Sequence, residues 1–179
     1  MNLYNYTTTA LEDWVTDLYL RRKIVLPRDI NPEKIGIIFG IYIHYKPLPT
    51  RYDIFGRYKA ININKHQESN LQKEEFLHEL GHILRHSGHQ TMMSDAFREL
   101  QEWDARNFTL YAALPHHMIK NYNLDDPYII DQLSYDFCVT PTLCKTRLDK
   151  IKSNIIISQS TKNNSKRGMR NDRRKIMYG

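Results

Sequence analysis

The chain has 179 residues, the length of one domain that can bury a hydrophobic core without disulfides or a structural metal. Apolar residues make up 41% and charged residues 26% of the sequence, which excludes a chain that is disordered throughout. No apolar stretch approaches the roughly 18 residues of a membrane-spanning helix, and the N-terminal residues lack a signal-peptide pattern. The two cysteines, Cys138 and Cys144, fit no short metal or redox spacing. We therefore expect a cytoplasmic protein with no membrane partner.

The net charge of +6 comes from the C-terminal end of the chain. Of the 26 basic and 20 acidic residues, seven basic and one acidic lie in residues 161–179, which leaves 19 of each sign in residues 1–160. This end is poor in apolar residues and rich in Asn, Ser, Lys and Arg, a composition typical of disorder. We predict a folded domain over residues 1–158 and a basic, disordered tail over residues 159–179, with at most weak affinity for nucleic acid.

Hydrophobic spacing predicts an α+β fold, mainly helical, with a small antiparallel sheet. The threonines at residues 7–9 and the Asn31-Pro32 pair are typical of helix starts. Two β-branched, aromatic segments are strand candidates, and the segment between them, which contains Pro47 and Gly56, is predicted to be a loop. The predicted helices cover residues 7–22, 31–40, 70–86 and 94–114, the predicted strands cover residues 41–45 and 58–63, and the rest of the domain is predicted to be helical.

The helix predicted over residues 70–86 carries the sequence H-E-L-G-H at positions 78–82. His78 and His82 project in the same direction one turn apart, beside an apolar stripe, so both imidazoles can reach one metal ion. The intervening Glu79 stands close enough to take a proton from water at that ion. The alternative is a pair of ordinary surface histidines, which the half-apolar character of the helix disfavours. We interpret the segment as the metal-binding helix of a zinc enzyme.

A zinc site of this class needs a third protein ligand. Extension of the motif to H-E-x-x-H-x-x-G-x-x-H would require a histidine at position 88, where the chain has Gly88. His86 and His89 stay open as substitute ligands. The next helix offers a better candidate, Glu102, which lies on the same side of that helix as the small residues Ala105, Thr109 and Ala112.

Those small residues, together with Gly81 on the metal helix, permit a close crossing that brings the Glu102 carboxylate to the histidines. Another side of the same helix is covered by bulky side chains: Phe97, Leu100, Trp103, Phe108, Tyr111 and Leu114. Asp104 points away from Glu102 and is predicted to be structural. Glu99, one turn earlier, is the reserve ligand.

The H-E-L-G-H segment is followed by Glu102-Trp103-Asp104-Ala105-Arg106-Asn107-Phe108 and then by Ala113-Leu114-Pro115. This series resembles the ImmA/IrrE family of metallopeptidases, whose usual pattern is H-E-x-G-H, then E-x-x-A-[ND]-x-F-A, then an apolar run that ends in L-M-P. The resemblance covers roughly residues 10–151. The chain departs from the pattern at Arg106, where the family usually has Asn or Asp, with Asn107 as a neighbouring substitute, and at Leu114, where it usually has Met.

The resemblance implies a zincin-like domain in which His78, His82 and Glu102 hold Zn2+ and Glu79 is the general base. Members of the family are commonly encoded on prophages and mobile elements, where they cleave or inactivate a partner repressor. We therefore expect an endopeptidase whose substrate is a helix-turn-helix repressor. The group that stabilises the oxyanion stays open between His86 and a nearby tyrosine.

Two functions of other classes stay open as alternatives. Residues 130–148 could form two short helices joined at Thr140-Pro141, which would resemble the helix-turn-helix of a DNA-binding regulator. Few basic residues lie near the second of these helices, which favours a packing role. The other alternative is a catalytically silent protein that binds a repressor stoichiometrically.

Overall fold

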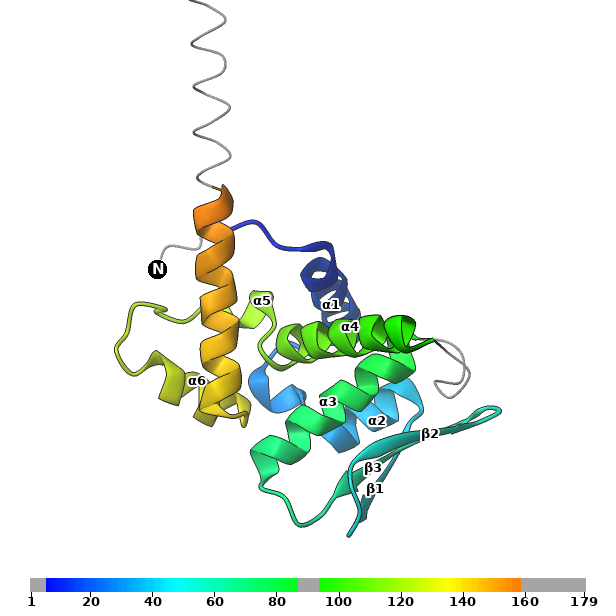
Figure 1. The fold of residues 1–179 in the computed structure, drawn as a ribbon. Coiled ribbons are helices and arrows are strands. Elements are labelled where there is room, and N and C mark those ends of the chain that lie inside the picture. The colour runs from blue at the N-terminus through cyan, green and yellow to red at the C-terminus, as the bar shows by residue number, and fades with distance from the viewer. Residues whose placement is uncertain (1–5, 87–93, 159–179) are drawn as a thin grey trace, which may run out of the picture.

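Helix α3 (Ser69–Arg85) lies between a small sheet and helix α4 (Asp95–Ala113), as Figure 1 shows. The structure is a computed structural model that describes residues 6–86 and 94–158. The remaining elements are α1 (Ala10–Arg21), a short 3-10 helix (Pro27–Asp29), α2 (Pro32–Phe39), α5 (His116–Ile119), α6 (Ile129–Phe137) and a helix over residues 141–158. The mainly helical α+β fold is therefore confirmed. Among the described residues, no helix is both long and apolar enough to cross a bilayer.

The sheet has three strands in the order β1 (Tyr42–Lys46), β3 (Tyr58–Asn64) and β2 (Arg51–Phe55). β1 runs parallel to β3, so the antiparallel pairing predicted for these two strands is wrong. The antiparallel partner of β3 is β2, which lies inside the segment predicted to be a loop. The short strand escaped detection because prolines precede it and Gly56, at a φ of 60°, follows it directly in the hairpin turn.

Side-chain caps begin the first two α-helices at the positions that the sequence indicates. The Thr9 side chain accepts a hydrogen bond from the Glu12 N–H, and the Glu12 carboxylate accepts one from the Thr9 N–H, which completes a capping box. Asn31 caps α2 in front of Pro32, and Gly40 ends that helix in the left-handed conformation. Local sequence signals therefore determine where these helices begin.

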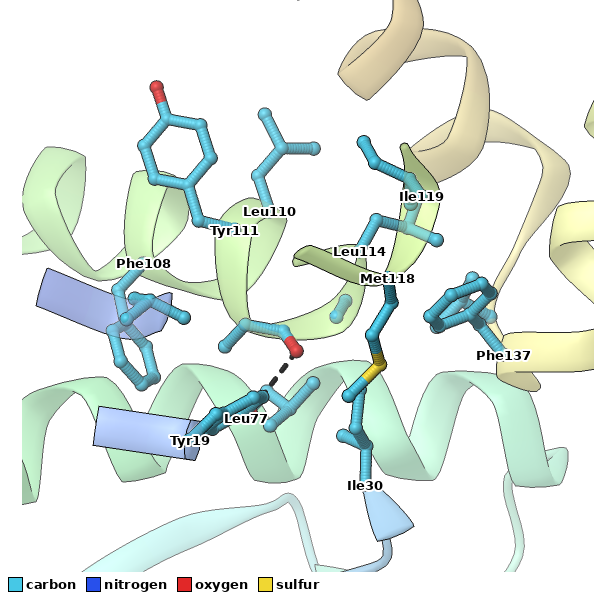
Figure 2. Packing of buried hydrophobic residues seen from close by; sticks show 14 of the residues in the cluster. Tyr19, Ile30, Leu77, Phe108, Leu110, Tyr111, Leu114, Met118, Ile119 and Phe137 are labelled. Carbon is cyan, nitrogen blue, oxygen red and sulfur yellow. Dashed lines mark hydrogen bonds between the residues drawn. The ribbon is translucent and has the colours of Figure 1, made fainter. Parts of the chain in front are cut away.

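One hydrophobic core joins α1, α3, α4, α5 and α6. Figure 2 shows Tyr19, Leu77, Phe108 and Phe137, which come from four of these helices, among the buried residues of this core. The Tyr19 hydroxyl donates a hydrogen bond of 3.1 Å to the carbonyl oxygen of Ala112, so α1 is also tied to the backbone of α4. This core holds α3 against α4, and the candidate site is built on those two helices.

The bulky side chains of α4 are buried only in the C-terminal half of the helix. Phe108, Tyr111 and Leu114 are buried, but Phe97, Leu100 and Trp103 are exposed at 48, 58 and 57%. The physical reason is that, among the described residues, the elements packed against α4 do not cover its first turns.

A buried ion pair connects the two ends of the folded domain. The Arg147 guanidinium lies 2.5 Å from a Glu12 carboxylate oxygen, and the two residues are 0 and 1% exposed. Arg147 also donates to the Leu114 carbonyl oxygen, and its guanidinium lies over the Tyr111 ring at 4.8 Å. Burial alone would raise the pKa of Glu12, but Arg147 and the hydrogen bond from Tyr6 outweigh it and lower the pKa. This network positions the helix of residues 141–158.

We predict that Arg147→Ala lowers the free energy of unfolding by about 3–5 kcal/mol, because it leaves the Glu12 carboxylate buried without its partner. Urea denaturation at neutral pH measures the loss. The deficit should shrink as the pH falls toward about 4, because Glu12 takes up a proton more readily without Arg147. As a control, Arg21→Ala removes an exposed pair with Asp17 and should cost less than about 1 kcal/mol. An equal, pH-independent loss in both variants would contradict the assigned role of the pair.

Candidate metal centre

The rotation of α3 is set by its buried apolar residues. Phe76, Leu77 and Leu80 are fully buried, and this stripe turns the neighbouring face of the helix toward β2 and α4. His78 and His82 lie on that neighbouring face, one turn apart. Their rings approach edge to face, with centroids 4.8 Å apart. The two imidazoles therefore converge, as the spacing in the sequence predicts.

Three potential metal ligands meet at one point between α3 and α4. The Nε2 atoms of His78 and His82 are 3.2 Å apart, and each lies 3.3 Å from an oxygen of the Glu102 carboxylate. A tetrahedral ion with bonds of about 2.0–2.2 Å holds its ligand atoms roughly 3.3–3.6 Å apart. Two nitrogens and a carboxylate at these separations fit such an ion, because their lone pairs converge and one cation can accept all of them. In the described part of the chain, this trio is the group that could hold a metal ion.

Contact between Gly81 and Phe108 allows α4 to approach α3 closely enough for this arrangement. A Cβ atom added at Gly81 would lie 2.8 Å from Cδ1 of the Phe108 ring, which is closer than side-chain carbons approach. Phe108 is itself fully buried and also contacts Trp14 edge to face. The sequence predicts a close crossing through Gly81 and small residues of α4. In the structure, the atoms nearest to a Cβ at Gly81 belong to the Phe108 side chain.

Glu79 lies beside His78, His82 and Glu102, the three side chains called the metal cluster below, and is held by the sheet. One of its carboxylate oxygens accepts a hydrogen bond of 3.2 Å from the backbone N–H of Tyr52 on β2. Burial raises the pKa of Glu79 to about 7; the Tyr52 N–H opposes this rise, and the Glu102 and Glu75 carboxylates add to it. A carboxyl group whose pKa lies near neutrality can both accept and return a proton at physiological pH.

Tyr52 is the residue of this site that the sequence analysis did not assign. Its ring stacks on His82, with centroids 5.6 Å apart and planes inclined by 27°. Burial raises the pKa of Tyr52, and the nearby Glu79 and Glu102 carboxylates add to the rise, so the phenol keeps its proton. Burial also lowers the pKa of His82, which keeps this imidazole in the neutral form that binds metals. A prediction that residues 51–55 form a strand of the sheet would have drawn attention to Tyr52.

The other candidates from the sequence occupy different positions. Asp104 accepts two hydrogen bonds from Arg85, and one of its oxygens lies 3.5 Å from His86, so Asp104 is structural as predicted. His86 therefore faces Asp104 and is not part of the trio. Glu99 is exposed and also lies outside the trio. His89 lies outside the described residues.

Asn107 does not take the place of the Asn or Asp that the family pattern has one residue earlier. Its side-chain amide donates to the carbonyl oxygen of Trp103, and its oxygen accepts from the Lys150 ammonium group. Arg106 is exposed. β2 supports one of the candidate metal ligands through the Tyr52 ring, which stacks on His82.

The fold and the site together define the class of the protein. A helix with the H-E-x-x-H sequence crosses a second helix that supplies a carboxylate, and the edge strand of a small sheet lies next to the first helix. This is the arrangement of a metallopeptidase-type domain, with two histidines and a glutamate that could hold one metal ion.

Comparison with known proteins assigns the family. The IrrE N-terminal-like domain of the M78 peptidases matches residues 38–149, a range that contains the whole metal cluster. The protein YqaB of Bacillus subtilis (strain 168) is 31% identical over 147 residues, which covers 80% of this chain and 84% of that protein. The phage-like element PBSX protein XkdA of the same organism is 30% identical over 141 residues, which covers 78% of this chain and 71% of that protein. The chain belongs to the IrrE N-terminal-like family of metallopeptidase domains, and the resemblance seen in the sequence is confirmed.

We predict that Gly81→Ala lowers stability by about 1–2 kcal/mol, although alanine is ordinarily favoured over glycine in a helix. The added methyl group has to displace the Phe108 ring and, with it, α4. Phe108→Leu should destabilise the wild-type protein but restore part of the stability of Gly81→Ala, and a double-mutant cycle by urea denaturation measures this coupling. Additive effects of the two changes would show that the two side chains do not limit the crossing.

Proposed function

We propose that the protein is a zinc-dependent endopeptidase in which His78, His82 and Glu102 hold Zn2+ and Glu79 is the general base. The convergence of two imidazole nitrogens and a carboxylate at separations of 3.2–3.3 Å carries this proposal. Two nitrogens and one oxygen are ligands that zinc favours, and three protein ligands leave a coordination position for the reaction. Membership of a metallopeptidase family supports the same conclusion.

Zinc in a site of this kind stabilises negative charge on a carbonyl oxygen and makes water more acidic. Side chains of the protein then transfer the proton. The Glu79 carboxyl group, with one oxygen fixed by the Tyr52 N–H, accepts the proton of the attacking water and passes it to the leaving amine. The ring of Tyr52 stacks on His82, and its protonated phenol is the group that we propose as hydrogen-bond donor to the developing oxyanion.

The outer edge of β2 suits an extended substrate segment. β2 is an edge strand, and its Tyr52 N–H points away from β3, toward α3. In an antiparallel strand the outward-facing peptide groups recur at every second residue, so those of Tyr52 and Ile54 face the same way. An extended peptide that adds to this edge would place its backbone beside the metal cluster. Recognition of this kind favours a substrate with an exposed flexible segment over a compact one.

The proposed substrate is a transcriptional repressor of a phage or mobile element, cut at one or a few bonds so that repression is relieved. The similarity to a protein named for a phage-like element supports this context. A cytoplasmic site of action agrees with the two free cysteines. The DNA-binding alternative finds less support, because the helix of residues 141–158 carries Arg147, Leu148 and Ile151 into the core. The basic tail, residues 159–179, lies outside the described residues.

A first test of the proposal is metal content. Purified protein should bind about one zinc ion per chain, and the double variant His78→Ala/His82→Ala should lose it, as measured by elemental analysis and by competition with a chelating dye. Glu102→Ala should weaken zinc binding by roughly 10- to 100-fold or more, whereas Glu99→Ala, one turn away and exposed, should bind zinc as the wild type does. Full zinc retention in the double-histidine variant would refute the site.

A second test separates catalysis from stoichiometric binding. Glu79→Gln should keep its zinc but cut a repressor encoded by a neighbouring gene roughly 10²- to 10⁴-fold more slowly, because the amide cannot accept the proton. Glu99→Gln, an exposed carboxylate outside the trio of candidate ligands, is the matched control and should stay active. Cleavage is followed by mass spectrometry with the repressor and with casein.

If Glu79→Gln inactivates the repressor at the wild-type rate, the stoichiometric alternative is correct. Rapid digestion of casein together with an intact repressor would contradict only the proposal that the substrate is a regulator.

A further inference from the structure

One side of the three-stranded sheet faces away from the helices. Ile61 and Ile63 of β3 point into the core, and Figure 1 shows the labelled helices above and to the left of the sheet. Alternate residues of each strand point the opposite way. The strand register brings these residues together on the second side, called the outer face below: Tyr42, His44 and Lys46 of β1, Tyr58, Ala60, Asn62 and Asn64 of β3, and Arg51, Asp53 and Phe55 of β2.

Three aromatic side chains gather at the hairpin end of the outer face. Tyr42, Phe55 and Tyr58 are 59, 73 and 41% exposed, and a group of exposed rings on a folded domain marks a binding surface. Tyr42 and Tyr58 stack, with centroids 5.1 Å apart and planes inclined by 20°, and the Tyr58 hydroxyl lies 3.0 Å from Nε2 of His44. Phe55 lies directly opposite Tyr58 on the neighbouring strand. The two tyrosine rings are therefore held in place without a ligand, which reduces the entropy lost on binding.

The polar residues give the outer face a positive charge. Asp53 is its acidic residue, and the Asp53 carboxylate accepts a hydrogen bond of 2.6 Å from Asn62 and lies 3.5 Å from Arg51. Lys46 and the hairpin residue Arg57 are both exposed, and within the described part of the chain neither forms an ion pair. One cation without a counter-charge therefore stands near each end of the face.

Exposed rings flanked by cations are the combination that binds single-stranded nucleic acid. Bases stack on aromatic side chains, and phosphates interact with Arg and Lys. Successive residues on one face of a strand are roughly 7 Å apart, so a base on a ring and its phosphate beside a cation both fit on this sheet. A duplex keeps the flat sides of its bases stacked on one another. An apolar protein partner would desolvate the cations without supplying counter-charges, which is costly.

We propose that the outer face binds single-stranded nucleic acid, with bases stacked on its three rings and phosphates beside Lys46, Arg51 and Arg57. Tyr52 points to the other side of the sheet, where its ring stacks on His82. Nucleic acid on the outer face therefore leaves the metal cluster accessible. This inference adds a binding activity to the protein and does not rest on the proposed peptidase function.

The test measures binding of fluorescein-labelled strands to the full chain by fluorescence anisotropy. The ligands are an oligothymidylate of about 15 residues and an abasic strand of the same length, which keeps the phosphates but has no bases. The wild type should bind the oligothymidylate at least roughly fivefold more tightly than the abasic strand, because each stacked base contributes that factor or more. An oligouridylate of the same length shows whether RNA is bound as well as DNA.

Removal of single rings tests the stacking. Tyr42→Ala and Phe55→Ala should each weaken binding of the oligothymidylate roughly fivefold or more and leave binding of the abasic strand nearly unchanged. Both rings are largely exposed, so their loss should cost little stability, which thermal denaturation verifies. Tyr135→Ala is the matched control, because it removes an exposed tyrosine of α6 outside the outer face, and it should bind as the wild type does.

Removal of a cation tests the phosphate contacts. Lys46→Gln should reduce the slope of log affinity against log salt concentration by about 0.7, the value for one phosphate contact on a single strand. Lys145→Gln removes an exposed lysine from the helix of residues 141–158 and should keep the wild-type slope.

Equal affinity of the wild type for the oligothymidylate and the abasic strand would overturn the proposal, and so would wild-type affinity in both ring variants. Either result would assign the binding to phosphate contacts elsewhere on the chain, such as the basic tail. Absence of binding to every strand would overturn it too. Self-association of the wild type that Tyr42→Ala abolishes, measured by analytical ultracentrifugation, would assign the outer face to a second copy of the chain instead.

Discussion

The site depends above all on one contact, the approach of Gly81 on α3 to the Phe108 ring on α4. Without a side chain at position 81, the two helices come close enough for Glu102 to lie 3.3 Å from both histidines. A metal site tolerates little error, because bond lengths vary by only about 0.2 Å among its ligands. The helix packing must therefore be as precise as the chemistry, and the buried core around Tyr19, Leu77 and Phe137 provides that precision.

The sheet has a comparable role on the other flank of the cluster. Its edge strand β2 supplies the backbone N–H that orients Glu79 and the ring that stacks on His82. A backbone donor from a strand paired to β3 moves little, so the proposed general base is held by the rigid part of the fold. The same strand is the edge of the sheet, and one element thus orients the proposed general base and carries the edge at which we propose that an extended substrate adds.

The buried pair of Glu12 and Arg147 connects this local geometry to the whole domain. Arg147 brings the helix of residues 141–158 against Leu114 and Tyr111, at the end of α4. The first turns of that helix line a pocket beside His78. Contacts far from the metal cluster along the chain therefore fix the position of a helix that borders it.

The sequence by itself determined the helical periodicity, the caps at Thr9 and Asn31, and the pair of histidines one turn apart, because each depends on neighbours within a few residues. It also indicated Glu102 over Glu99 from the distribution of small side chains. Only the tertiary structure decided the parallel pairing of β1 with β3, the existence of β2, the role of Tyr52 and the exposure of Phe97, Leu100 and Trp103. These features depend on which distant segment lies alongside, and strand partners and the burial of one side of a helix are set by packing that local spacing does not encode.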